Sequence, residues 1–233
     1  MPIPKIAHFH WTGPQMSWLR GMSLLTFKKF NPTWEIRLHD TPPDIRAVGL
    51  PMYGQEADWT WWRKLYQDGG LLVATDVITV RPVPEEWLEG EIAATTNGGD
   101  AVYQFAVLGA EPRHPFLGRC VEACEKMAAN PKNLDYQAMG VIMLRGLAGK
   151  LPPKPALTEI PARAYCAVQW NETRHFWDEV EDLPLDDGIV GHHWFGGEES
   201  SKHNERIATA DSRFAIVRLA NKVYREDYAD TGE

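Results

Sequence analysis

The strongest candidate for chemistry is an acidic residue that closely follows a short apolar segment. Asp76 stands three residues after the wholly apolar run 71–73, which itself follows the glycine pair Gly69 and Gly70. In open α/β sheets, ligands bind beyond the carboxyl ends of strands, so the Asp76 carboxylate is expected to face a crevice. Carboxylate oxygens suit Mg²⁺ and Mn²⁺, which commonly bridge to substrate phosphates. The spacing therefore predicts a divalent-cation site, with a turn-capping aspartate as the alternative.

Two other places carry groups that could join such a site. His192 and His193 are adjacent in a late apolar segment, and neutral imidazole is a common metal ligand. A strand histidine can equally be structural. Asp58 stands at the predicted start of a helix over 58–67, where the helix dipole favours an acidic residue.

These residues also carry a family resemblance. Residues 69–77, Gly-Gly-Leu-Leu-Val-Ala-Thr-Asp-Val, resemble the glycine-glycine, apolar, Asp-x-Asp signature of the sugar-binding-region glycosyltransferases. That family includes fungal initiating mannosyltransferases, bacterial capsular-sugar transferases and, more distantly, the glucosylating domains of clostridial toxins. The likeness extends to four other segments: 3–13, 31–40, 57–66 and 191–194.

The resemblance implies specific roles for the matching residues. Trp11 would stack on the nucleotide base, because an aromatic face packs well on a π-system; a core Trp is the alternative. Asp58 would bond to hydroxyl groups of the ribose or donor sugar and, with Asp76, would form the catalytic pair. Asp76 and His193 (or His192) would hold the cation. The implied donor-binding residues are Trp11, Asp58, Gly69, Gly70, Thr75 and Asp76.

The implied activity is transfer of a hexose or related sugar from a nucleotide diphosphate sugar to a hydroxyl group. The acceptor would be a glycan, a lipid-linked molecule or a protein, and the cofactor Mn²⁺ or Mg²⁺. The cation would stabilise the leaving diphosphate while the protein orients both substrates. In this family the anomeric configuration is retained. No side-chain nucleophile is evident, and no general base is assigned.

The sequence departs from the family pattern at three positions. Ala74 replaces the first Asp of the Asp-x-Asp motif, Trp61 replaces an Arg, and Gly197-Glu198 replaces a late Ser-Trp. A lost charged contact is worth about 1.5–3 kcal/mol of binding. Side chains that could compensate are Glu56, Asp68, Asp100, Arg63 and Lys64.

These departures keep two other functions open. A catalytically impaired binding or structural module would retain the fold and recognise nucleotide, glycan or protein without turnover. A metal-dependent hydrolase would need several His and Asp residues to converge, for example His8, His10 and His193, but no spacing motif supports it.

Composition limits the class of protein. The 233 residues carry a formal net charge of −8, which argues against general nucleic-acid binding because a basic face would be needed. Three cysteines form no metal-binding or disulfide pattern, so free thiols in a reducing, cytoplasmic setting are expected. The sequence contains no apolar run of about 18 residues, so no transmembrane segment is expected.

The elements that must position the candidate site alternate between strands and helices. Strands are predicted over 3–11, 34–38, 71–73, 77–80, 91–96, 101–109 and 189–194. Helices are predicted over 17–30, 58–67, 116–129, 136–147 and 208–228, and 198–204 is expected to be mobile.

This alternation predicts an α/β layered fold. The resemblance specifies a Rossmann-like GT-A domain with a mixed, mostly parallel central sheet. It implies one domain over 1–233, with a nucleotide-sugar-binding half (1–100) and an acceptor and closing half (101–233).

Overall fold

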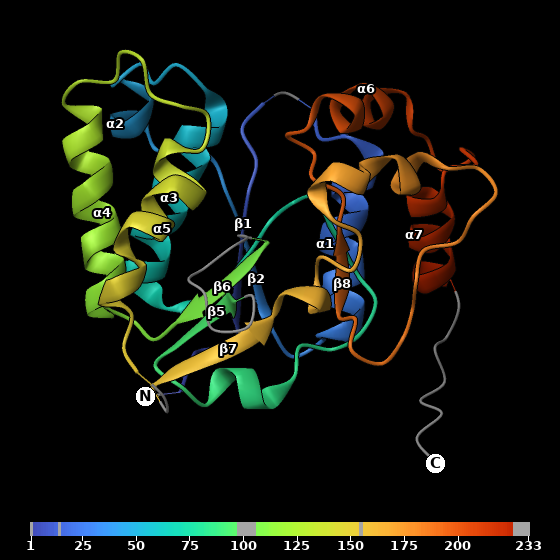
Figure 1. The fold of residues 1–233 in the computed structure, drawn as a ribbon, viewed down its shortest axis with the longest axis horizontal. Coiled ribbons are helices and arrows are strands. Elements are labelled where there is room, and N and C mark those ends of the chain that lie inside the picture. The colour runs from blue at the N-terminus through green and yellow to red at the C-terminus, as the bar shows by residue number, and fades with distance from the viewer. Residues whose placement is uncertain (1, 14, 97–105, 154–155, 226–233) are drawn as a thin grey trace. The chain divides into compact units, whose positions relative to one another are not determined.

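The computed structural model describes residues 2–13, 15–96, 106–153 and 156–225, and the chain divides into two compact units (Figure 1). Unit 1 comprises Met1–Pro14, Thr33–Ala74 and Pro84–Ala162; unit 2 comprises Gln15–Pro32, Thr75–Val83 and Arg163–Glu233. Each unit is therefore assembled from segments that are distant in the sequence. The assignment of a donor half and an acceptor half to one domain stays a prediction.

Unit 1 contains a six-stranded sheet with the order β2-β1-β3-β6-β5-β7. β1 pairs in parallel with β2 and β3, and β5 pairs in parallel with β7, whereas β6 is antiparallel to β3 and β5. This arrangement confirms the predicted mixed, mostly parallel sheet. The strands are β1 (Ile6–His10), β2 (Glu35–His39), β3 (Gly70–Val73), β5 (Ile92–Thr96), β6 (Val107–Ala110) and β7 (Leu157–Pro161).

The sheet contains one strand that the sequence did not predict and one that is only partly described. β7 follows a proline-rich stretch and was not predicted. Of the strand predicted over 101–109, residues 101–105 lie outside the described residues, and β6 occupies its end. β3 is buried along its whole length, as expected for a central strand that lies between two neighbours.

The long helix α3 (Tyr53–Asp68) packs against β1 and against α4 (Pro115–Ala128). Trp62 is fully buried on α3, and its indole Nε1 donates to the carbonyl oxygen of Met139 at 2.8 Å. α3 begins five residues before the predicted start. Asp58 therefore lies in the second turn, so the explanation of Asp58 as a helix-starting acid is wrong.

The remaining helices of unit 1 are short. The predicted helix 136–147 is broken at Gly140, whose backbone is not helical. The sequence predicted no helix between 39 and 57, but α2 (Pro43–Arg46) lies there. The other short elements are η1 (Glu85–Leu88), η2 (Ala138–Ile142), α5 (Met143–Leu147) and η3 (Ala148–Lys150).

Unit 2 is built around a two-stranded antiparallel sheet of β4 (Val77–Thr79) and β8 (Gly191–His193). The helix α1 (Trp18–Phe30) packs against β4 and α7 (Ala215–Arg225). Ser17 caps α1 by accepting from the backbone N–H of Arg20. The core of the unit includes Leu19, Ile78, Phe176, Trp194, Ile216 and Leu219.

The segment expected to be mobile, 198–204, is instead mostly helical. Glu198 caps α6 (Glu199–Ile207) by accepting from the backbone N–H groups of Ser200 and Ser201. A polar composition suggested a loop, but capping and side-chain contacts hold the helix in place. The sequence also did not predict the 3-10 segments η4 (Ala162–Ala164) and η5 (Trp170–Trp177).

All three cysteines are buried free thiols, which confirms that part of the sequence prediction. A cytoplasmic setting stays a prediction. Among the described helices, none has the length and apolar character that crossing a membrane requires.

Candidate functional site

The glycine pair lies where three strands come close together in unit 1. Gly69 and Gly70 have positive φ angles of 64° and 108°. A Cβ at Gly70 would lie 2.5 Å from the carbonyl oxygen of Ile6, and one at Gly69 would lie 2.7 Å from the backbone nitrogen of Pro112. Glycine is thus required here by backbone conformation and packing. The predicted contact of these glycines with a donor is untested.

A chain of histidines supports this turn. His8 Nε2 donates to the carbonyl oxygen of Gly69 at 2.8 Å, and His8 Nδ1 lies 2.9 Å from Nε2 of His39. Burial lowers the pKa of His8 and lowers that of His39 to about 4, so both rings are neutral at pH 7. His10 bonds separately to the Thr41 hydroxyl at 3.1 Å. These contacts give His8 and His10 structural roles within unit 1.

The Asp58 side chain is half-buried on α3. Burial raises the pKa of its carboxyl well above the ordinary value. A carboxyl group in such surroundings can donate or accept a hydrogen bond to a hydroxyl. The predicted contact of Asp58 with donor hydroxyl groups stays a prediction.

Two tryptophans predicted near the site differ in exposure. Trp11 follows β1 and is half-buried, with its indole nitrogen buried. Trp61, at the position of the expected Arg, is buried on α3, and its ring meets the edge of His10 with centroids 6.0 Å apart. Trp61 therefore belongs to the packing of α3 against β1 and supplies no charge.

Asp76 and His193 form the closest pair among the predicted site residues. β4 and β8 place Val77 opposite His193, and Trp194 N donates to the Asp76 carbonyl oxygen at 3.0 Å. His193 Nε2 then lies 3.2 Å from Asp76 Oδ2, an atom that also accepts from the Gly196 backbone N–H at 2.7 Å. The structure therefore brings the predicted cation-binding residues together.

The electrostatics of this pair favour ionisation of both side chains. Burial alone would favour their neutral forms. For His193, the nearby Asp76 carboxylate outweighs burial and raises the pKa to about 10. For Asp76, His193 and the Arg20 guanidinium outweigh burial and lower the pKa. The pair is an imidazolium and a carboxylate at neutral pH.

His192 is a structural residue. Its Nε2 donates to the carbonyl oxygen of Pro184 at 2.8 Å, and its ring meets the edge of Phe176. Burial lowers its pKa to about 4, so the ring is neutral. Of these two histidines, His193 is the one that pairs with Asp76.

Sequence reasoning missed three residues that surround Asp76. Arg20 bonds to the Thr75 hydroxyl at 2.8 Å and forms an ion pair with Glu205. The Gly196 backbone contacts the Asp76 carboxylate. No sequence signal links Arg20 to Glu205 because they lie 185 positions apart. The hydroxyl of Thr75, predicted to bind the donor, accepts from Arg20 and keeps its own O–H free to donate, so its contact with a donor stays a prediction.

Asp76 and His193 could hold a divalent cation only if further ligands came from outside the protein. Among the described residues, no group of three or more His, Cys, Asp or Glu side chains could hold a metal ion. Asp76 and His193 offer one carboxylate and one imidazole. Mg²⁺ is commonly bound by one or two carboxylates together with substrate phosphates and waters. The pair thus fits a cation that is shared with a diphosphate.

The compensating residues considered from sequence are mostly engaged elsewhere. Asp68 pairs with Arg37 at 2.8 Å, and Arg63 pairs with Asp44 at 2.5 Å. Glu56 is buried on α3. Asp100 lies outside the described residues. A metal-dependent hydrolase would need several converging ligands. In the part of the chain that the structure describes, no three His, Cys, Asp or Glu side chains come together in a way that could hold a metal ion.

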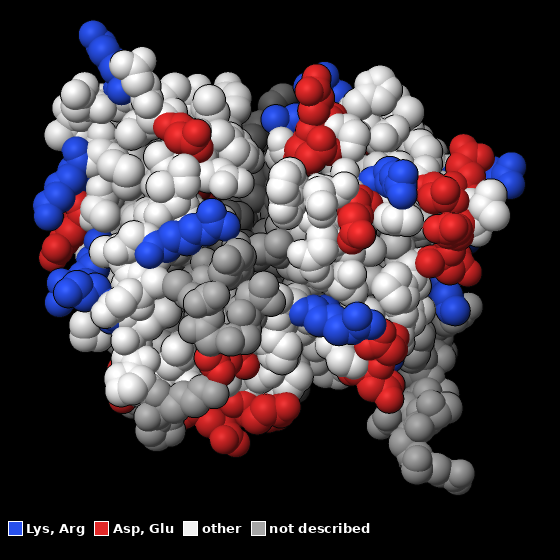
Figure 2. All heavy atoms as spheres, in the orientation of Figure 1, with Lys and Arg blue, Asp and Glu red and all other residues white. Residues whose placement is uncertain are grey.

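Acidic and basic side chains are interspersed on the face that Figure 2 shows. The acid-rich segment 178–187 is partnered by arginines in unit 2. The ion pairs are Arg213 with Glu179, Arg218 with Asp182, Arg163 with Asp186 and Arg81 with Asp187. This segment therefore forms a structural network.

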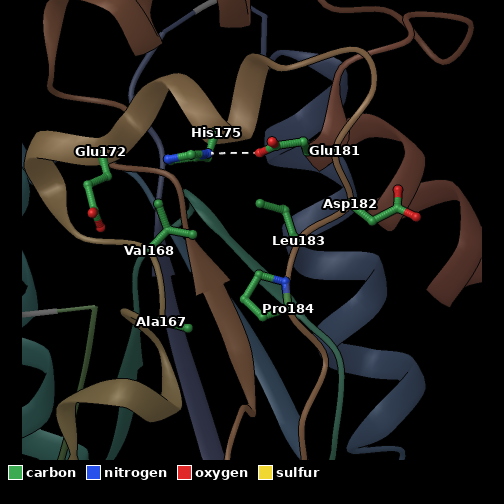
Figure 3. Close-up of a pocket in the computed structure, with 8 residues that line it drawn as sticks. All are labelled: Ala167, Val168, Glu172, His175, Glu181, Asp182, Leu183 and Pro184. Atoms are coloured by element: carbon green, nitrogen blue, oxygen red, sulfur yellow. Dashed lines mark ion pairs between the residues drawn. The ribbon is translucent and has the colours of Figure 1, made fainter.

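A hollow of about 290 Å³ lies beside this segment in unit 2 (Figure 3). Its rim includes His175 and Glu181, whose Nδ1 and Oε2 atoms are 3.4 Å apart (Figure 3). Glu172 accepts from the backbone N–H of Gln169 at 3.2 Å. Because its polar rim is already partnered, we assign no ligand to this hollow.

No family model matches the sequence. The human alpha-1,4-N-acetylglucosaminyltransferase is 36% identical over 59 residues, which are 25% of this chain and 15% of the human enzyme. The match thus spans a small part of that curated relative.

Solved structures resemble the chain over much greater lengths. The galactosyltransferase LgtC, solved with donor and acceptor sugar analogues, has a TM-score of 0.52 and 12% identity, covering 94% of this chain and 95% of LgtC. The glycosyltransferase GlyE of Streptococcus pneumoniae has a TM-score of 0.56 and 11% identity, covering 96% of this chain and 61% of GlyE. The PaToxG glycosyltransferase has a TM-score of 0.53 and 14% identity, covering 65% of this chain and 71% of PaToxG. The chain therefore has the GT-A fold of glycosyltransferases.

Proposed function

We propose that this protein transfers a hexose or related sugar from a nucleotide diphosphate sugar to a hydroxyl acceptor. The observation that supports this most strongly is the ion pair of Asp76 with His193 in unit 2, in a chain of GT-A fold. Sugar transfer is the reaction class for which this fold and this pair are best suited.

Asp76 and His193 would hold Mn²⁺ or Mg²⁺ together with the donor diphosphate. When bound, such a cation neutralises the charge that develops on the leaving diphosphate. Asp76 contributes an ionised carboxylate because its pKa is lowered by His193 and Arg20. His193 must give up the proton on Nε2 to coordinate, so cation binding should release a proton.

The other predicted residues complete the proposal for the donor. Trp11 would stack its indole ring on the nucleotide base. Asp58 would bond to ribose or sugar hydroxyls, which suits a half-buried carboxyl whose pKa is raised by burial. Gly69, Gly70 and Thr75 would also contact the donor; the conformation of the glycine turn and the bond from Arg20 to the Thr75 hydroxyl would fix their positions. Retention of the anomeric configuration follows from the family resemblance, and the acceptor is a glycan, lipid-linked or protein hydroxyl.

The test is release of nucleoside diphosphate from UDP-sugars and GDP-sugars in the presence of Mn²⁺. We expect Asp76→Asn to lower the rate by about 100-fold or more, since a catalytic cation supplies several kcal/mol of transition-state stabilisation. Asp211→Asn is a matched control, because Asp211 is an exposed acid of the same unit. Unchanged turnover in Asp76→Asn would refute the assignment. Nucleotide binding without turnover by the wild type would favour the impaired binding module.

A further inference from the structure

The side chain of Arg20 reaches three segments of unit 2 that surround Asp76. From α1, its Nε and Nη2 atoms donate to the two carboxylate oxygens of Glu205 at 2.7 and 3.0 Å. Its Nη1 atom donates to the hydroxyl of Thr75, the residue before Asp76, at 2.8 Å. One guanidinium thus joins α1, α6 and the turn that carries Asp76.

Glu205 also forms a hydrogen bond with Trp194, the residue that follows His193. Its Oε2 lies 3.3 Å from the indole Nε1 of Trp194, which donates to it. Its Oε1 accepts from the hydroxyl of Ser17, the cap of α1, at 2.8 Å. The carboxylate therefore fixes the segment after His193 relative to α1.

The Arg20–Glu205 pair also packs directly on Gly196. A Cβ at Gly196 would overlap Arg20 Nη2 and would lie 3.1 Å from Glu205 Oε2 and 3.2 Å from Asp76 Oδ2. The backbone N–H of this glycine donates to Asp76. The glycine thus lets the ion pair approach the backbone that orients the Asp76 carboxylate.

The burial of this pair is not explained by stability alone. The side chains of Arg20 and Glu205 are only 16% and 9% exposed. Removing two charges from water costs nearly as much as their attraction returns, so a buried ion pair is weak evidence for stability. A bidentate pair does fix geometry, because the guanidinium fork allows few orientations.

We propose that Arg20 and Glu205 are positioning residues for Asp76 and His193. Arg20 bonds to Thr75, the residue before Asp76, and Glu205 bonds to Trp194. Both side chains pack on Gly196, whose backbone N–H contacts the Asp76 carboxylate. The family pattern would use a second acid at position 74, where this chain has Ala. Here the orientation of the single remaining acid is supplied by an ion pair from α1 and α6. This inference rests on the proposed function, because it assigns the pair to a diphosphate-binding site.

The test compares Arg20→Gln with Arg218→Gln. Arg218 also bonds to a carboxylate, that of Asp182, and to backbone carbonyl groups such as that of Asp178, in a part of unit 2 that does not include Asp76. We expect both variants to melt at lower temperatures. Only Arg20→Gln should weaken binding of UDP or GDP with Mn²⁺, by about tenfold or more, and Arg20→Lys should recover part of that loss because it keeps the charge.

A second measurement does not depend on nucleotide binding. The amide proton of Gly196 donates to a carboxylate, so its NMR resonance should move in Arg20→Gln and stay in place in Arg218→Gln. A nucleotide affinity and a Gly196 resonance that both remain at wild-type values in Arg20→Gln would overturn the inference. If the wild type binds neither nucleotide, the proposed function fails, and the Gly196 resonance alone decides whether Arg20 positions this site.

Discussion

His193 Nε2 lies 3.2 Å from Asp76 Oδ2. His193 belongs to β8, which pairs with β4, the strand that begins directly after Asp76. Burial disfavours both charges, yet each raises the tendency of the other to ionise. A pair of this kind is sensitive to removal of either partner, since the remaining charge is then buried alone. The same two side chains present an oxygen and a nitrogen to any cation that replaces the proton between them.

The first prediction concerns the pH dependence of stability. The folded pKa of His193 is raised to about 10 from an unfolded value of about 6.5. The stabilisation of the folded state by His193 is therefore complete below pH 6.5 and is lost as the pH rises toward 10. The pKa of Asp76 is lowered, so its contribution is complete above its unfolded pKa of about 3.9 and is lost at lower pH.

His193→Gln should therefore cost most between about pH 4 and 6.5, on the order of 3–5 kcal/mol. Melting temperatures of the wild type and the variant, measured from pH 5 to 10, should converge as the pH rises. His203→Gln is the control, because His203 is exposed on α6. A difference that stays constant up to pH 10 would contradict the ion pair.

The second prediction concerns the glycine turn. Gly70→Ala should destabilise the protein strongly, because φ is 108° and the new Cβ would meet the carbonyl oxygen of Ile6 at 2.5 Å. Gly21→Ala is the matched control: it lies within α1 with no atom within 4 Å of the new Cβ. In a helix interior this change should add about 0.5–1 kcal/mol of stability. Thermal unfolding that affects both variants equally would show that packing at β3 is looser than described.

The third prediction concerns acid. Burial lowers the pKa of His10 to about 4, below the unfolded value of about 6.5. Its contribution to stability is therefore present above pH 6.5 and is lost as the pH falls to 4. His10→Gln can still bond to Thr41 and should reduce this acid sensitivity by up to about 3 kcal/mol. Urea unfolding at pH 7 and pH 4 measures the difference, and an unaltered acid sensitivity would place the titration elsewhere.

Much of the fold was predictable because local patterns and long-range packing agree. α1 begins after Ser17, a capping residue, and ends before Asn31, as the sequence indicates. β3 was evident as an apolar run after two glycines. The start of α3 was missed because Pro51, Met52 and Gly54 suggest a loop, although the helix begins at Tyr53.

The candidate site was predictable only in part. Asp76 and His193 were found through a motif and a resemblance, and their contact follows from the pairing of β4 with β8. Arg20 and Glu205 carried no local signal, because their roles arise from a tertiary contact between α1 and α6. α6 itself was not predicted, because its sequence is polar and the helix is stabilised by the Glu198 cap and by that same tertiary contact.

The most direct test of the central claim is a crystal structure with Mn²⁺ and a nucleoside diphosphate, in which anomalous scattering locates the manganese. We expect the manganese to lie within bonding distance of an Asp76 carboxylate oxygen, of His193 Nε2 and of diphosphate oxygens. A well-occupied nucleotide whose manganese contacts neither side chain, with the Asp76–His193 ion pair intact, would contradict the claim.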